Sequence, residues 1–400
     1  MRLMSPSLLE VVVTGGSIKR IAWGDEGEAV MPELVYEHPR TGAARTGDES
    51  MAAGTGHRSR RNHFIPRLLL RGFASRVDGA KAWVYQALRG RTELMEVSTT
   101  DVGVERDFYG KTGDVEDELA FRENEHAPLV RRLRCREIDA ADPPAIARFV
   151  SDLIIRTRNS RLGMAEFGAQ MLDTFMRALE TQAVRDRFQQ DLMTVPTYRQ
   201  TLTILKVLPP AFREAMLNSL DPTLAKAFRG DAADLMRWML ASAPPNLMLD
   251  SVRDAQIRAL TEDRGARENN LRALQWTVES APGGTFILGE VGVLARFGDE
   301  HVVHAPLRPQ GAPVAFYLPL SSSSLLVGRE ESDNGYTPDA ETLNIASAEL
   351  SRSVFVSSTT SERERRYAVS IGARSALFSE EEVAQAMLQA LGLVPGHSEK

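Results

Sequence analysis

The sequence predicts an α+β fold, with a mainly helical centre between an N-terminal β-hairpin and a C-terminal antiparallel sheet. Two observations predict it. Short runs of β-branched and aromatic residues between turn residues occur towards both ends of the chain, whereas residues 114–275 carry apolar residues at helical spacing. The predicted strands also cluster and do not alternate with helices, which favours α+β over a doubly wound parallel sheet.

The composition excludes several classes of protein. The 400 residues, with 43% hydrophobic and 26% charged positions, suit one large or two loosely separated globular domains. No apolar run approaches the roughly 18 residues that a membrane helix needs. The single cysteine, Cys135, excludes an intrachain disulfide framework, and the net charge of −6 argues against a surface that is basic overall. We therefore expect a cytoplasmic protein without a membrane partner.

The chain divides into three predicted regions. Residues 1–50 have little periodic hydrophobicity and form a poorly ordered leader or extension, and we hypothesise that the native product starts at Met51. Residues 51–245 form the hairpin and the helical region. The Ala-Pro-Pro segment at 243–245 marks the next boundary, after which residues 246–400 form a C-terminal α+β region packed on the helices.

The segment 62–73 reads Asn-His-Phe-Ile-Pro-Arg-Leu-Leu-Leu-Arg-Gly-Phe. Pro66 suits the first turn of a helix because proline fixes φ and lacks an N–H donor, so we expect a short helix that ends near Gly72. A strand at 82–85 and a second strand around 93–97 would then form the N-terminal hairpin.

The centre of the chain carries a series of helical patterns. Residues 114–135 predict an amphipathic helix that Pro128 should kink or restart, and a second helix begins at Pro143 and runs past Arg161. Helical patterning continues over the segments 164–185, 197–206, 210–219, 231–241 and 250–275.

From Trp276 onwards the pattern changes to short strands between Gly, Pro and Asp turns. We expect strands at 276–278, 285–288, 291–294, 302–303, 314–318, 325–328 and 354–356. Helices at 341–350 and 379–391 complete the prediction.

Standard catalytic signatures are absent from the sequence. It contains no Gly-x-x-x-x-Gly-Lys-Ser/Thr loop, no His-Glu-x-x-His and no Gly-x-Ser-x-Gly. A common ATPase, zinc protease or serine hydrolase is therefore improbable. Only His301 and His304 lie near one another, and on a strand they would face opposite sides, so we expect no metal and no cofactor.

Several motifs follow the segment 62–73 in a fixed order along the chain. They are Trp-Val-Tyr at 83–85, Asp-Val-Gly-Val-Glu-Arg-Asp-Phe-Tyr at 101–109, the glutamates Glu116 and Glu123, then Phe149 and Arg-Thr at 156–157. This order resembles the bacterial family called Domain of Unknown Function 4238 between residues 62 and 161. The family has no established activity, so the resemblance implies a layout and no reaction.

One part of the sequence departs from that family. Its members often carry a Ser-Asp-Asn-Pro-Val loop after a Phe-Ile strand, whereas here Phe286 and Ile287 precede Leu-Gly-Glu-Val-Gly-Val. An activity that depends on the Ser, Asn and Pro of that loop is therefore not expected. The later Tyr-Leu-Pro-Leu-Ser segment at 317–321 fits the family again.

The candidate site joins charged and polar residues of these motifs. We expect His63, Glu116 and Glu123 as catalytic groups, and as ligand-binding groups Arg67, Arg71, Asp107, Tyr109 and Arg156. The two glutamates stand seven apart, so they share one helix face about 10 Å apart along its axis. A buried arginine cannot lose its proton and demands a carboxylate or a bound anion.

Three functions fit this set of residues. The first is binding of an anionic ligand, a nucleotide or nucleic acid, at an arginine-bearing cleft. The second is a hydrolytic enzyme centred on His63 with Glu116 and Glu123. The third is a non-enzymatic interaction protein in which the charges form a structural ion-pair network. Two basic clusters, at 58–61 and 131–136, suggest one positively charged face and support the first.

Overall fold

The computed structural model describes residues 61–110, 114–178, 181, 184–186, 247–261, 265–280, 285–298, 303–307, 312–333 and 335–390. The chain divides into two compact units, residues 1–56 and residues 57–400, and the described residues all belong to the second unit. The hypothesised start at Met51 and the helices predicted at 197–206, 210–219 and 231–241 lie outside the described residues. The division at residue 245 stays a prediction.

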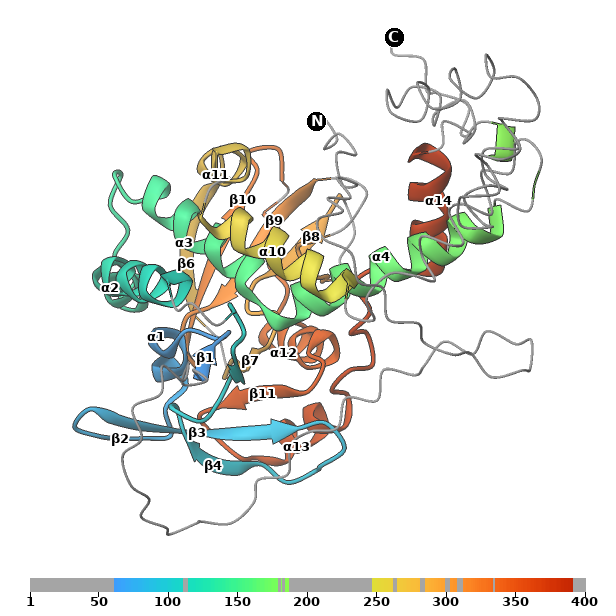
Figure 1. Ribbon diagram of the computed structural model, residues 1–400. Helices are drawn as coiled ribbons and strands as arrows, with labels where there is room; N and C mark the ends of the chain where they lie inside the picture. Colours follow the sequence, from blue (N-terminus) through green and yellow to red (C-terminus); the bar gives the residue numbers. More distant parts are fainter. Residues whose placement is uncertain are drawn as a thin grey trace, which may run out of the picture. The chain divides into compact units, whose positions relative to one another are not determined.

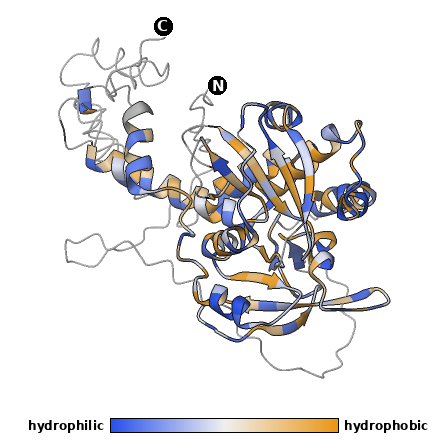
Figure 2. Ribbon diagram, turned by 180° about the vertical axis from the view of Figure 1, so that it is seen from behind, coloured by the Kyte–Doolittle hydropathy of each residue, from blue (hydrophilic) through white to orange (hydrophobic). Residues whose placement is uncertain are grey.

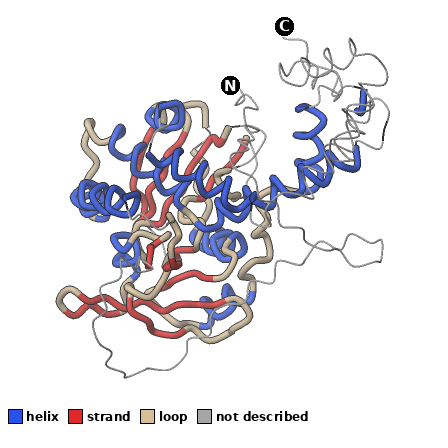
Figure 3. The backbone as a smooth tube through the Cα atoms, in the orientation of Figure 1, coloured by secondary structure: helices blue, strands red, loops and turns tan. Residues whose placement is uncertain are grey.

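The fold is α+β, as predicted, with helices between and beside antiparallel sheets (Figures 1 and 3). The described helices are α1 (Arg67–Leu70), α2 (Asp114–Arg134), α3 (Pro143–Arg156), α4 (Arg158–Ala178), α10 (Leu247–Thr261), α11 (Gly265–Arg272), α12 (Ala340–Leu350), α13 (Glu362–Val369) and α14 (Glu380–Ala390), with a 3₁₀ turn at Arg71–Phe73. None of these helices has the length and apolar character to cross a membrane.

The strands form three antiparallel sheets within the described residues. They are β1 (Arg61–His63), β2 (Arg76–Asp78), β3 (Lys81–Leu88), β4 (Met95–Ser98), β5 (Val104–Arg106), β6 (Gln275–Ser280), β7 (Leu288–Gly289), β8 (Leu294–Phe297), β9 (Pro313–Pro319), β10 (Ser324–Arg329) and β11 (Val354–Ser357). β1 pairs with β5, and the C-terminal sheet has the order β6-β10-β9-β8. The third sheet has the order β2-β3-β11-β7, with β4 paired to β3.

The predicted N-terminal hairpin is present as β3 and β4, with Trp83 opposite Ser98. It also pairs with the far end of the chain, since Val354 of β11 lies opposite Leu88 of β3. The N-terminal and C-terminal strands therefore share one sheet, which local sequence patterns did not predict.

The C-terminal sheet contributes to the main hydrophobic core of the described residues. Its central strands carry Tyr317, Leu318, Leu326 and Val327, all buried, and Figure 2 shows hydrophobic residues along these strands. A strand predicted at 291–294 was wrong in its first part, because Gly292 has a φ of +66° and turns the chain before β8 begins. Similarly, the strand predicted at 285–288 is reduced to β7.

Pro66 stands at the start of α1, as predicted, with φ of −58° and an extended ψ of 134°. The prediction for Pro128 was different, since α2 runs through this residue without a restart. Pro128 has no N–H group to donate to the backbone carbonyl of Asn124, one turn earlier. Both residues are exposed. Water can bond that carbonyl, so the proline costs the helix less than it would in a buried position.

The predicted helix from Pro143 past Arg161 was wrong, because the chain breaks at Thr157. Thr157 has an extended ψ of 147°, and its Oγ1 accepts a hydrogen bond from the backbone N–H of Ser160 at 3.1 Å. A threonine that caps the next helix in this way ends one helix and begins another. The break leaves Arg156 at the last position of α3, with its side chain buried in the interior.

A close contact between β7 and α12 should make Gly289 indispensable to this junction. A methyl group at Gly289 would overlap the carbonyl oxygen of Ser347 and Oγ of Ser351. The hydroxyls of Ser347 and Ser351 also accept hydrogen bonds from the backbone N–H groups of Gly289 and Glu290. We expect Gly289→Ala to lower the free energy of unfolding by about 1–3 kcal/mol in urea titrations. Gly265→Ala, where a methyl group meets nothing within 4 Å, is the control and should change it by less than about 1 kcal/mol. Equal losses would contradict this explanation.

Candidate functional site

Arg156 is the centre of the candidate site. Its guanidinium is buried and donates to Glu123 Oε1 at 2.5 Å and to the Tyr109 hydroxyl at 2.9 Å. It also donates twice to the main-chain oxygen of His63, at 2.6 and 3.2 Å. One side chain therefore joins β1, the turn that carries Tyr109, α2 and α3.

The electrostatics of this cluster keep Arg156 charged. Burial acts to lower its pKa, but the neighbouring Tyr109 and Glu123 raise the pKa above its ordinary value. Burial raises the pKa of Tyr109 to about 12, so its hydroxyl stays protonated and accepts the arginine N–H through its oxygen. This is a matched charge network, the arrangement that a structural role requires.

Glu116, the other predicted glutamate of α2, contacts strand β1. The side-chain amide of Asn62 donates to Glu116, and in the β1–β5 pair Asn62 lies opposite Glu105. Glu105 in turn pairs with Arg158 at 3.0 Å. The opening motif, residues 62–73, thus contacts α2 through Asn62, and Glu105, which lies opposite Asn62 in the sheet, contacts the start of α4.

His63 lies half-buried at the edge of this network. Burial lowers its pKa to about 4, and the charges of Arg67, Arg156 and Arg61 act in the same direction. Its Nδ1 is buried and has no hydrogen-bond partner among the described residues, while a hydrogen bond with the backbone of Val102 acts to raise the pKa of the ring. The ring is therefore neutral at pH 7, while its backbone oxygen carries the contact to Arg156.

The other predicted residues occupy different places. Arg67 is exposed, and Arg71 is exposed and donates to the main-chain oxygen of Ala80 in the β2–β3 turn at 2.5 Å. Asp107 is half-buried with a φ of +52°, a left-handed conformation that places it in the turn before Phe108 and Tyr109. The structure brings together His63, Tyr109, Glu123 and Arg156, whereas Arg71 contacts a turn outside this group.

Sequence reasoning missed a second buried arginine. Arg161 packs its guanidinium over the ring of Phe108 at 3.5 Å and donates to Gln256 at 2.8 Å. Burial lowers its pKa to about 10, so it remains a cation at pH 7. The sequence analysis predicted one continuous helix through Arg156 and Arg161. It therefore did not predict the change of chain direction at Thr157, between the two arginines.

A small cavity lies where α1, α2 and α3 meet, and sequence reasoning missed most of its polar residues. Its lining residues are Pro66, Leu68, Leu119, Arg122, Glu123, His126, Phe149, Asp152, Leu153 and Arg156. The free space of about 20 Å³ suits one ordered water molecule and is too small for a nucleotide.

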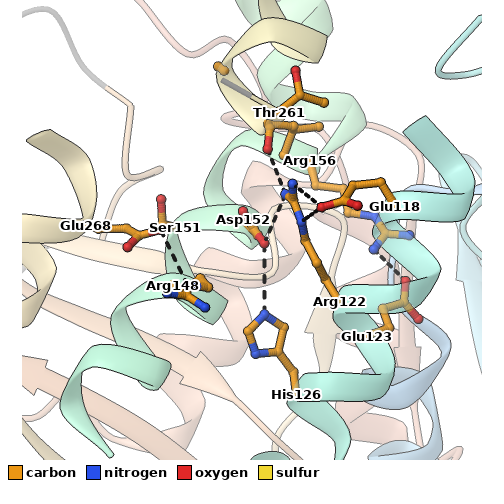
Figure 4. Close-up of polar contacts among 12 residues, drawn as sticks. Glu118, Arg122, Glu123, His126, Arg148, Ser151, Asp152, Arg156, Thr261 and Glu268 are labelled. Atoms are coloured by element: carbon orange, nitrogen blue, oxygen red, sulfur yellow. Dashed lines mark hydrogen bonds and ion pairs between the residues drawn. The ribbon is translucent and has the colours of Figure 1, made fainter. Parts of the chain in front are cut away.

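Three of the lining residues, Arg122, His126 and Asp152, lie together in a polar cluster (Figure 4). His126 Nε2 lies 3.9 Å from Asp152 Oδ2, and Arg122 Nη1 lies 3.7 Å from the same oxygen. Figure 4 shows His126 projecting from α2 towards Asp152 on α3. The signal for this cluster was spacing, since Arg122 and His126 stand four apart and therefore share a helix face with Glu123 nearby.

The basic cluster at the end of α2 serves the fold in part. Arg134 donates to the main-chain oxygens of Leu68 and Leu320, and burial lowers its pKa to about 10. Arg132 pairs with Asp139 and Asp142. Two of the four arginines are thus held by the structure, which weakens the prediction of one continuous basic face.

No group of three or more possible metal ligands occurs within the described ranges. His301 lies outside them, while His304 bridges Ala295 and contacts Arg374 through Nδ1 at 3.4 Å.

Removing the charge of Arg156 should destabilise the protein. We expect Arg156→Met to lower the free energy of unfolding by about 3 kcal/mol, because it leaves the half-buried Glu123 and the main-chain oxygen of His63 without their donor. Arg148→Met on the same helix is the control, since Arg148 is exposed and its one ion pair with a described residue, to Glu268, is long at 3.9 Å. It should cost less than about 0.5 kcal/mol. Equal effects in urea titrations would contradict a central role for Arg156.

The lowered pKa of His63 predicts sensitivity to acid. Because its folded pKa of about 4 lies below the ordinary 6.5, the unfolded chain takes up this proton first as the pH falls. The folded protein therefore keeps its full stability with respect to His63 above pH 6.5 and loses stability as the pH falls from 6.5 to 4. His63→Gln should unfold like the original protein at pH 8 but lose less stability at pH 5, by about 2 kcal/mol. Parallel pH curves for the two proteins would show that His63 does not titrate in this way.

Comparisons with known proteins agree with this layout of motifs. No curated protein and no solved structure matches the chain. The family described as "Protein of unknown function (DUF4238)" matches residues 61–340, from β1 to the start of α12 and thus beyond the segment 62–161 in which the sequence motifs lie. The chain belongs to this DUF4238 family.

Proposed function

We propose that the protein binds an anionic ligand, such as the phosphate of a nucleotide or nucleic acid, at the opening motif beside His63 and Arg67. The observation that carries this proposal is the electrostatic environment of the His63 ring. The charges with the largest effect on it belong to three arginines, Arg67, Arg156 and Arg61. A neutral imidazole at a site of positive potential favours a negative partner.

The three arginines differ in how their charges are balanced. Arg156 is matched by Glu123, and Arg61 pairs with Asp101 at 2.9 Å. Arg67 is exposed and forms no ion pair with another described residue. The positive charge without an acidic partner therefore belongs to Arg67, at the surface, where a ligand can reach it.

The chemistry of these groups suits phosphate. An arginine fork donates two parallel hydrogen bonds to phosphate or carboxylate. An anion between Arg67 and His63 would also raise the pKa of the imidazole and allow it to donate a further hydrogen bond. The cavity between the helices holds about one water, so the exposed face of the opening motif is the better place for a large anion.

The hydrolytic alternative at His63 has weaker support. Glu123 is engaged by Arg156, and Glu116 accepts from Asn62, so both carboxylates have structural partners. The interaction-protein alternative explains these pairs equally well but leaves the exposed charge of Arg67 without a role. A cytoplasmic location remains part of this proposal.

Phosphate binding should depend on Arg67 and weaken with salt. We expect Arg67→Gln to bind a single-stranded oligonucleotide and ATP at least about tenfold more weakly in calorimetric titrations, because a charged hydrogen-bond donor is lost. Arg91→Gln is the matched control, an exposed arginine in the turn before β4 that does not contribute to the environment of His63. His63→Gln should keep the fold, since Arg156 contacts its main-chain oxygen.

The probes also separate the ligand classes. Affinity for the oligonucleotide that falls steeply with salt while ATP does not bind would identify nucleic acid as the partner. Absence of binding to both probes, or equal losses in Arg67→Gln and Arg91→Gln, would refute anion binding at this place and favour a non-enzymatic interaction protein.

A further inference from the structure

The outer face of the N-terminal hairpin carries aromatic residues that belong neither to the hydrophobic clusters of the described residues nor to the candidate site. We propose that Arg76, Trp83 and Tyr85 on this face form a stacking platform for the bases of single-stranded nucleic acid. The inference names the partner class of the proposed anion site, and it rests on that proposed function for the capture of phosphates.

The strand register places the three side chains on one face of the sheet. Arg76 lies opposite Trp83 in the β2–β3 pair, and residues directly opposite in an antiparallel pair share a face. Tyr85 stands two residues after Trp83 and therefore shares that face as well. Val84, between the two aromatic residues, is fully buried in the main hydrophobic core. The face with Trp83 and Tyr85 is thus turned away from that core.

Helix α13 covers one end of this face, whereas no described helix covers the aromatic end. Ala87 of β3 belongs to a hydrophobic cluster with Tyr367 and Ala368 of α13. Trp83 and Tyr85 are half-buried, and Figure 1 shows the β2 end of the hairpin extending away from α13. The hydroxyl of Tyr85 has no hydrogen bond to another described residue. Its ring and its hydroxyl are therefore both available to a ligand.

Arg76 is held in a stacking geometry before a ligand arrives. Its guanidinium carbon lies 3.9 Å from the centroid of the Trp83 ring, and its Nη2 pairs with Glu96 at 3.5 Å. Glu96 lies opposite Tyr85 in the β3–β4 pair, so both contacts are on the same face. The side chain of Arg76 is nevertheless 54% exposed. Because bases stack on guanidinium planes as well as on aromatic rings, Arg76 and Tyr85 offer neighbouring stacking surfaces.

Exposed cations connect this platform with the proposed anion site. Arg71 follows Arg67 by four residues at the end of α1, so the two lie about one helical turn apart. Arg71 reaches the β2–β3 turn at Ala80, and the exposed Lys81 begins β3 beside it. Arg67 and Lys81 form no ion pair with another described residue. Asp78 is the acidic residue of this hairpin, so positive charge prevails along a path that suits the phosphates of a bound strand.

The chemistry of the face favours a single strand over a duplex. The bases of a duplex stack on one another, whereas the bases of a single strand can be splayed out onto aromatic side chains. Aromatic side chains beside a positively charged path are the usual means of binding single strands without sequence preference. The flat face also lacks a protruding helix that could enter a major groove.

The experiment uses the full chain and two labelled probes of equal length, an oligothymidylate and an abasic oligodeoxynucleotide, in fluorescence polarisation titrations. We expect the original protein to bind the oligothymidylate more tightly, because the abasic probe has phosphates but no bases. Tyr85→Val should bind the oligothymidylate about tenfold more weakly and the abasic probe equally well. Tyr85→Phe keeps the ring and should restore the affinity. Phe121→Val is the matched control, an aromatic residue on α2 that is 60% exposed, and should bind both probes like the original protein.

A second variant tests the placement of Arg76. Trp83→Val removes the ring over which the guanidinium lies, and it should weaken binding of the oligothymidylate but not of the abasic probe. Thermal unfolding verifies that each variant is folded. An equal loss for both probes in a folded Tyr85→Val or Trp83→Val would show a structural role and overturn the inference.

Arg67→Gln separates the platform from the proposed anion site, because it should weaken both probes. Weaker binding in Arg67→Gln together with unchanged binding in Tyr85→Val would overturn the platform and leave the anion site. The reverse result would support the platform and refute the anion site. Equal affinity of the original protein for the two probes, or no binding of the oligothymidylate, would overturn the inference and favour a protein partner for this face.

Discussion

The structure depends on the burial of one charged side chain, that of Arg156. Removing a guanidinium from water costs several kcal/mol unless its donors are fully matched by acceptors. Here the acceptors come from β1, the Tyr109 turn and α2, segments that are far apart in the sequence. None of them can move away without leaving a buried charge incompletely bonded, so the opening motif and the helices hold one another in position.

Elements with a local physical cause could be predicted from the sequence. Pro66 starts α1 because its φ is already helical, and the hairpin of β3 and β4 forms from residues with high β propensity. The pairing of β11 with β3 joins residues about 270 positions apart, and no local pattern encodes it. Thr157 misled the prediction because a threonine is tolerated inside a helix and also caps the next one.

The candidate site could be predicted in part for a similar reason. His63, Tyr109, Glu123 and Arg156 belong to motifs whose order was recognisable, and the structure brings them together. Arg71 is an arginine like Arg156 but contacts the turn at Ala80, because the direction of its side chain depends on where α1 ends. The cluster of His126 with Asp152 arises from the packing of α2 on α3, and neither helix alone shows which of its polar residues faces the other.

Stability and chemistry are separable at the opening motif because Arg156 contacts His63 through the main chain. Any residue at position 63 provides that main-chain oxygen, so the hydrogen bonds from Arg156 do not explain why the residue is a histidine. Its ring is placed where burial and positive charge hold its pKa near 4, which is unfavourable for a group with a merely structural purpose. A negative ligand would offset the positive charge of the arginines around the ring. The proposed binding of an anion would therefore explain the identity of this side chain, which the structural network leaves unexplained.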